Sequence, residues 1–144
     1  MARPLLIAAD HGGFELKEHL KKFLDARGVA YEDLGTDSAA SVDYPDYARL
    51  VAGAVSRAEA ERGLLVCGTG QGMALAANRF PGVRAVTPFD EETARLVREH
   101  NDGNILALGG RVLAPDLAER ILALFLDTPF AGGRHERRVQ KIDA

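Results

Sequence analysis

Strand-length apolar stretches alternate along the chain with amphipathic stretches and with glycine- or proline-bearing breaks. Five stretches, most of them continuously apolar, predict strands at residues 4–9, 29–34, 63–67, 83–87 and 104–108. A strand covered on both faces has no polar side to present, so runs of this kind predict a parallel sheet buried between two layers.

Helical periodicity lies between the predicted strands. In residues 13–27 leucines recur on one face, and Lys17 is expected to lie off that face. Pro45 suits the first turn of a second helix, which we expect to continue to Gly63. The other predicted helices cover residues 73–80, the segment from the Asp90 cap to about residue 99, the segment after Pro115, and a basic tail at about 134–143.

This alternation predicts an α/β fold, a three-layer α/β/α Rossmann-like sandwich with a five-stranded parallel sheet. Right-handed crossovers between parallel strands place helices on both faces of such a sheet. The order of the strands does not follow from the pattern. A length of 144 residues suits one domain, residues 1–144.

Composition narrows the functional class. The net charge of −3 argues against a general nucleic-acid or membrane-surface binder. No stretch approaches the ~18 apolar residues of a membrane helix, and the first apolar run is too short for a signal peptide. Cys67 is the only cysteine, so no internal disulfide is possible, and we expect a reducing cytoplasm.

Three polar clusters are the candidates for chemistry: residues 10–13, residues 67–72 and residues 100–102. In open α/β sheets ligands bind at the carboxyl ends of the strands. The first two clusters follow predicted strands directly, and the third ends the helix before the last strand. We interpret all three as strand-end clusters, and their coincidence is more informative than any one of them.

A lone cysteine is most often a small buried apolar residue. Cys67 stands instead where a strand enters the glycine-rich loop 68–72 and a helix follows. A helix N-terminus stabilises a thiolate, and glycines let backbone N–H groups approach an anion. Met73 stands where the dinucleotide motif G-x-G-x-x-G has its third glycine, which disfavours a nucleotide-dependent oxidoreductase. It also stands where a phosphatase C-x5-R loop has its arginine, which disfavours a phosphatase.

The other polar residues keep structural alternatives. His100 would suit a helix C-terminus, and Asp10 and His11 would suit a cap and a turn. Guanidinium groups match phosphate oxygens, but a basic tail can also be solvated. The candidate phosphate ligands are Arg111, Arg134 and Arg138.

Five segments together resemble ribose-5-phosphate isomerases of type B, which group with the subunits of galactose-6-phosphate isomerase. The segments are AADHGGFELK, DYPDYA, CGTGQGMALAANRFPGVRA, HNDGNILALGGR and GGRHERRV. They occur in this order and cover nearly the whole chain. The combination is far more specific than any of the glycine motifs alone.

The resemblance implies an aldose–ketose isomerase of the pentose phosphate pathway that interconverts ribose 5-phosphate and ribulose 5-phosphate through a cis-enediolate. It implies that Cys67 is the proton-transferring base, that Thr69 lies beside it, and that His100 helps to open the furanose ring. Some relatives use serine here and a glutamate further along the loop, but this loop has no glutamate. The implied substrate contacts are Asp10, His11, Gly68, Gly70, Gln71, Gly72, Asn101, Arg111, Arg134 and Arg138.

The resemblance also implies no cofactor, no metal, and homodimers or tetramers with active sites between subunits. The tail helix is then expected to pack on a partner subunit. It stays open which subunit supplies His100 and the arginines. Two alternatives remain: an isomerase of allose 6-phosphate or galactose 6-phosphate, and a non-catalytic sugar-phosphate-binding module. The second is disfavoured because a binding module needs no base.

Overall fold

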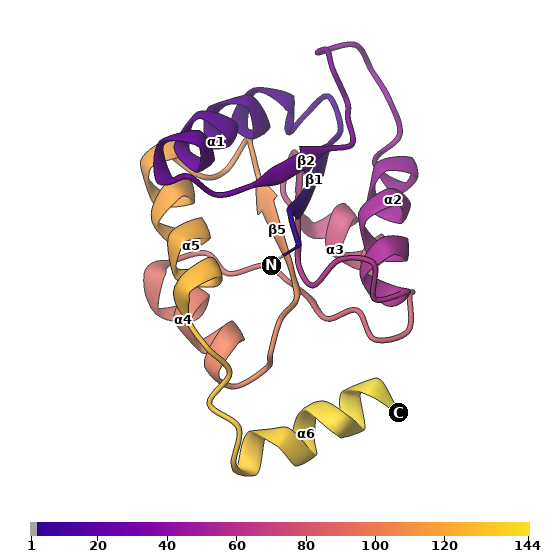
Figure 1. The fold of residues 1–144 in the computed structure, drawn as a ribbon. Helices are drawn as coiled ribbons and strands as arrows, with labels where there is room; N and C mark the ends of the chain where they lie inside the picture. The colour runs from indigo at the N-terminus through magenta and orange to yellow at the C-terminus, as the bar shows by residue number, and fades with distance from the viewer. Residues whose placement is uncertain (1–2) are drawn as a thin grey trace.

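Strands and helices alternate along the chain as predicted. The structure is a computed structural model that describes residues 3–144. The strands are β1 (Leu5–Ala9), β2 (Tyr31–Asp33), β3 (Gly63–Cys67), β4 (Ala85–Val86) and β5 (Ile105–Gly109). The helices are α1 (Phe14–Arg27), α2 (Tyr44–Ser56), α3 (Gln71–Ala77), α4 (Glu91–Glu99), α5 (Pro115–Asp127) and α6 (Arg134–Asp143) (Figure 1).

The five strands form one parallel sheet in the order β2-β1-β3-β5-β4. The predicted fold class is confirmed, and the strand order is new information. The chain passes from β1 outward to β2 and then returns to β3 on the other side of β1. The carboxyl ends of β1 and β3 therefore flank the switch point where ligands bind in such sheets. Cys67 is the last residue of β3.

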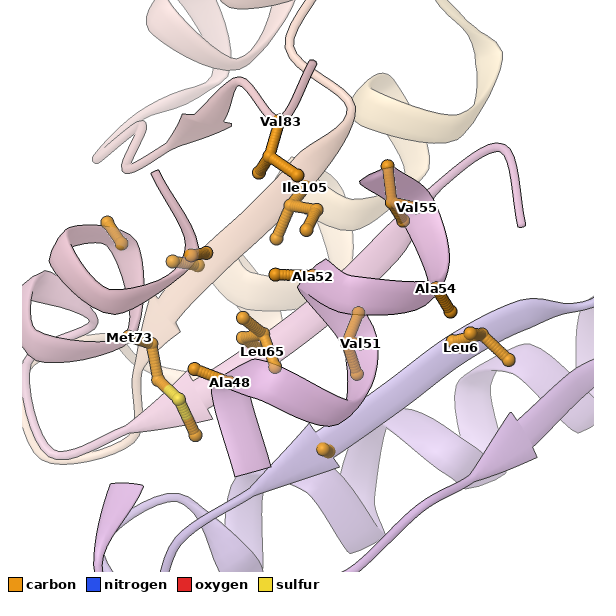
Figure 2. Packing of buried hydrophobic residues seen from close by; sticks show 14 of the residues in the cluster. Leu6, Ala48, Val51, Ala52, Ala54, Val55, Leu65, Met73, Val83 and Ile105 are labelled. Carbon is orange, nitrogen blue, oxygen red and sulfur yellow. The ribbon is translucent and has the colours of Figure 1, made fainter. Parts of the chain in front are cut away.

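Two hydrophobic layers enclose the sheet. One contains buried residues of α2 and α3, and the other contains those of α1, α4 and α5. Side chains alternate along β1, so Leu6 faces the first layer and Ile7 the second. Figure 2 shows Ala48 of α2 lying against Leu65 of β3, a contact that brings the helix close to the sheet. Each fully buried leucine or isoleucine contributes about 1.5–3 kcal/mol.

The prediction that the second helix continues to Gly63 is wrong. Helix α2 ends at Ser56, and Gly63 begins β3. Ala58 has a positive φ of 60°, and the N–H of Glu59 donates to the carbonyl of Ala54. A residue in this left-handed conformation often ends an α-helix, and it is usually glycine. Because alanine occupies the position, the sequence carried no stop signal there.

The prediction that Lys17 lies off the buried face is also wrong, since its side chain is fully buried. Its Nζ donates to both carboxylate oxygens of Asp33, at 2.7 and 2.8 Å, and to the carbonyl of Thr36 at 2.7 Å. All three ammonium protons thus have acceptors. The pair connects α1 to the carboxyl end of β2. The acceptors of Lys17 come from residues 33–36, and the periodicity of α1 alone gives no information about that segment.

Asp33 keeps its charge at this position. Partial burial alone would raise the pKa of Asp33, but hydrogen bonds from Lys17, the Gly35 N–H and Lys21 outweigh it and lower that pKa. A carboxyl group with a lowered pKa in the folded state stabilises the fold above its ordinary pKa of about 3.9. That contribution is lost as the pH falls through the folded-state value.

Replacing Asp33 by alanine should destabilise the protein by about 2–3 kcal/mol at neutral pH, because the buried Lys17 ammonium loses its charged partner. Lys17→Met should cost less, because it removes the buried charge as well. Urea unfolding of both variants measures the difference. A larger loss in Lys17→Met than in Asp33→Ala would contradict this view of the pair.

Candidate active site

The carboxyl ends of the three central strands are joined by backbone hydrogen bonds. The N–H of Asp10, after β1, donates to the carbonyl of Val66 at 3.2 Å. The N–H groups of Gly110 and Arg111, after β5, donate to the carbonyls of Cys67 at 2.8 Å and Gly68 at 2.9 Å. Each segment that follows a strand is therefore anchored to the next one, with Cys67 in the middle.

These segments approach so closely that side chains would collide. A Cβ atom on Gly13 would lie 2.2 Å from the Val66 carbonyl oxygen and 2.8 Å from the Cys67 nitrogen. A Cβ atom on Gly110 would lie 2.7 Å from the carbonyl oxygen of Gly12. The glycines that follow β1 and β5 are thus required by the packing of backbone against backbone around Cys67.

Cys67 is held by the loop that follows it. Its side chain is 5% exposed, and its Sγ accepts a hydrogen bond from the Gly70 N–H at 3.1 Å. Gly70 has a left-handed φ of 84° and precedes the first residue of α3. Thr69 is exposed beside it, and its Oγ1 accepts from the Gln71 N–H at 3.3 Å. The loop after β3 therefore holds the sulfur at the end of the strand through this hydrogen bond.

Polar groups of the first cluster lie next to this loop. The buried Asp10 accepts the Gly13 N–H at 3.1 Å through Oδ1. His11 Nδ1 accepts the Val42 N–H at 3.2 Å, so the proton of a neutral ring sits on Nε2 and can be donated. The Arg111 guanidinium is packed over the loop: a Cβ atom on Gly68 would be 3.1 Å from its Nη1.

His100 and Asn101 lie at the opposite edge of the sheet within one chain. His100 ends α4, and the following loop reaches Asn104, whose carbonyl accepts the N–H of Gly63 at 3.0 Å. Gly63 begins β3 and Cys67 ends it, so the strand separates the two clusters by roughly 13 Å along its axis. The interpretation of residues 100–102 as a third strand-end cluster is therefore wrong, because these residues precede β5 at the amino-terminal edge of the sheet.

Helix α6 lies apart from the helices that cover the sheet (Figure 1). The ring of its His135 contacts the ring of His100, so α6 shares the amino-terminal edge with His100. The N–H of Ala131 donates to the carbonyl of Glu99 at 3.1 Å, and Arg84 binds Asp143 at 2.9 Å. Arg134 and Arg138 lie one helical turn apart on α6, and both are exposed. The two arginines are thus grouped with His100 and not with Cys67.

Asn101 lines a cavity of about 670 Å³ at the same edge, between the segment from Asn78 to Val86 and the end of α6. His135 of α6 is a residue of this edge to which the sequence analysis assigned no role. It lies within the GGRHERRV segment, and only its contact with His100 in the folded chain distinguishes it.

Large apolar side chains are exposed around the Cys67 edge. Val112 follows Arg111 and is 64% exposed, and Phe89, in the loop after β4, is 68% exposed. Leu75 of α3 is 64% exposed. The ring of Tyr44 lies against the same loop, because a Cβ atom on Gly72 would be 2.7 Å from it. Apolar groups of this size around a polar centre are typical of a surface that another chain covers.

The Cys67 edge combines a thiol sulfur that accepts a backbone N–H, a carboxylate, an imidazole and a guanidinium. Such a set can remove a proton from carbon next to a carbonyl group and can bind an anionic substrate. Among residues 3–144, no three histidine, cysteine, aspartate or glutamate side chains are grouped so as to hold a metal ion, and no helix is long and apolar enough to cross a membrane.

Comparison with known sequences gives matches over nearly the full length. The sequence model of the family described as Ribose/Galactose Isomerase matches residues 5–142. The putative sugar phosphate isomerase YwlF of Bacillus subtilis is 47% identical over 137 residues, which are 94% of this chain and 92% of the relative. Ribose-5-phosphate isomerase B of Escherichia coli is 44% identical over 142 residues, 99% of this chain and 95% of the relative.

Solved structures show the same fold. A ribose 5-phosphate isomerase from Thermotoga maritima superimposes with a TM-score of 0.94 at 52% identity, covering 97% of both chains. Ribose-5-phosphate isomerase B from Mycoplasma genitalium, solved with bound ribulose-5-phosphate, gives a TM-score of 0.92 at 39% identity. That match covers 97% of this chain and 93% of the other.

Replacing Gly13 by alanine should destabilise the protein by about 1–3 kcal/mol, because the new methyl group collides with the backbone of Val66 and Cys67. Gly53→Ala in α2 is the matched control. Its methyl group closely approaches the end of the flexible Arg57 side chain and is in ordinary contact with Phe80, and alanine favours the helix. Thermal unfolding compares the two, and equal stability of both variants would contradict the close packing at Cys67.

Proposed function

The chain belongs to the ribose/galactose isomerase family, and from this premise we propose that it interconverts ribose 5-phosphate and ribulose 5-phosphate, with Cys67 as the base. The observation that carries the role of Cys67 is its Sγ, held by the Gly70 N–H where β1, β3 and β5 end together. The five-carbon substrate is supported by relatives such as the Escherichia coli enzyme, whose name states it.

The reaction moves one proton between neighbouring carbons. The Cys67 thiolate removes the proton from C2 of the open-chain aldose, and the electron pair forms a C1–C2 double bond while the charge moves to the C1 oxygen. The sulfur then returns the proton to C1, and the hydroxyl proton passes from O2 to O1. Backbone N–H groups of residues 68–72 stabilise the enediolate, at roughly 3–4 kcal/mol for each well-placed donor.

Ribose 5-phosphate is mostly a furanose, so its ring must open before C2 becomes acidic. Opening removes a proton from O1 and delivers one to the ring oxygen. We assign this transfer to His100, with Asn101 contacting the sugar. Asp10 and His11 contact the substrate from the Cys67 edge, and no step requires a metal or a cofactor.

The position of His100 requires a second copy of the chain. Cys67, His11 and Arg111 lie at one edge of the sheet, whereas His100 and the α6 arginines lie at the other. In a symmetric dimer the amino-terminal edge of each subunit covers the Cys67 edge of its partner, which forms two equal sites. The exposed Phe89 and Val112 around the Cys67 edge support this arrangement.

Phosphate then binds between subunits. Arg134 and Arg138 present two guanidinium groups from one turn of α6, and Arg111 approaches from the other subunit. Guanidinium groups bind phosphate oxygens through paired hydrogen bonds. A thiol base is best preserved in a reducing compartment, so we place the enzyme in the cytoplasm.

Cys67→Ala should lower kcat for ribose 5-phosphate by about a thousandfold or more, because the variant lacks the group that moves the proton. Binding of the substrate, measured by calorimetry, should change little, since the phosphate ligands remain. The assay follows ribose 5-phosphate and ribulose 5-phosphate by NMR. Turnover close to that of the unmodified protein would refute the assignment of the base.

Subunits that carry defects on opposite edges should complement each other. When Cys67→Ala is co-expressed with the double variant Arg134→Ala/Arg138→Ala, random pairing gives mixed dimers in half of the cases. Each mixed dimer has one intact site of two, which combines Cys67 of one subunit with the arginines of the other. The mixture should recover about a quarter of full activity. Cys67→Ala with Arg111→Ala is the control without recovery, because both defects lie on one edge. Equal activity of the two mixtures would exclude a site shared between subunits.

A further inference from the structure

His135 has no part in the reaction described above, yet it makes a specific contact with a residue that does. Its ring stacks on that of His100, with 4.2 Å between the ring centroids and an angle of 16° between the ring planes. Near-parallel rings in contact attract each other through dispersion between their faces. The stack restricts both the position and the plane of the His100 ring.

The backbone on both sides of the stack is anchored. The N–H of His100 donates to the carbonyl of Leu96 at 2.9 Å, and the N–H of His135 donates to that of Gly132 at 3.1 Å. Arg84 binds both Asp102, beyond His100, and Asp143, at the end of α6. The loop after α4 and helix α6 are therefore joined independently of the two imidazoles, and the rings are brought together by the fold.

The charges around His135 favour an uncharged ring. Partial burial lowers the pKa of His135, and His100, Arg134 and Arg138 lower it further, while Glu99 of α4 acts in the opposite direction. The pKa of His135 is therefore lower than the ordinary histidine pKa of about 6.5. At neutral pH a neutral imidazole thus lies against His100, so the stack carries no repulsion between two imidazolium groups.

We propose that His135 is a positioning residue, whose ring holds the His100 imidazole in the orientation needed to transfer a proton during opening of the sugar ring. This inference rests on the proposed function. Proton transfer requires alignment within hydrogen-bond distance, and a misplacement of about 1 Å can cost a hundredfold in rate. No other part of the reaction uses His100, so the loss of the stack should slow one step alone.

The experiment uses His135→Ala and His135→Phe, with Gln140→Ala on the exposed face of the same helix as the control. Each full-length variant converts ribose 5-phosphate and the same substrate deuterated at C2. His135→Ala should lower kcat/KM by about 10- to 100-fold, with an isotope effect close to one, because ring opening then limits the rate. His135→Phe, which keeps the stack, should stay within about threefold of the unmodified protein.

Three results would overturn the inference. His135→Ala could turn over as fast as the Gln140→Ala control. It could be slow with an isotope effect clearly above one, which would mean that removal of the C2 proton had been slowed. His135→Phe could be as slow as His135→Ala, which would mean that a polar contact of His135 matters instead of the stack. Absence of turnover in the unmodified protein would refute the proposed function itself.

Discussion

The close contact of three strand ends is the constraint on which the site depends. The backbone around Cys67 accepts hydrogen bonds directly from the N–H groups of Asp10, Gly110 and Arg111. The backbone of Val66 and Cys67 also lies so close to Gly13 that this position has no room for a side chain. The sulfur is thus placed by backbone geometry at the end of a sheet that has hydrophobic layers on both faces. Residues that follow β1 and β5 reach the same point although they are about a hundred positions apart in sequence.

The same geometry divides the chemistry. In a parallel sheet, residues that follow a strand lie at the carboxyl edge, and residues that follow a covering helix lie at the amino-terminal edge. Cys67 follows the first rule, and His100, at the end of α4, follows the second. A catalytic set that contains both residues is incomplete in one chain, so the proposed reaction needs the proposed dimer. The His100–His135 stack and the Arg84 ion pairs then give the amino-terminal edge its own fixed arrangement.

Much of this was readable from the sequence, because local rules suffice for it. The strand runs and the Asp90 cap follow from apolar patterning and capping, and the structure agrees. Glycine content also predicted a loop after Cys67, but α3 already begins at Gln71 instead of Met73. The incorrect predictions concern residues whose burial or location depends on segments that are distant in sequence. Lys17 is buried because its acceptors come from β2 and the loop after it, and His100 lies away from Cys67 because of the direction of α4. The proposed role of His135 depends on a contact between the end of α4 and α6, which local sequence patterns do not predict.

The most direct test of a substrate held between two subunits is a crystal structure of the Cys67→Ala variant with ribose 5-phosphate. We expect a dimer in which the phosphate contacts Arg134 and Arg138 of one subunit, while C2 of the sugar lies next to residue 67 of the other. A phosphate bound by the arginines of the chain whose residue 67 faces C2, or a sugar bound away from residue 67, would contradict it.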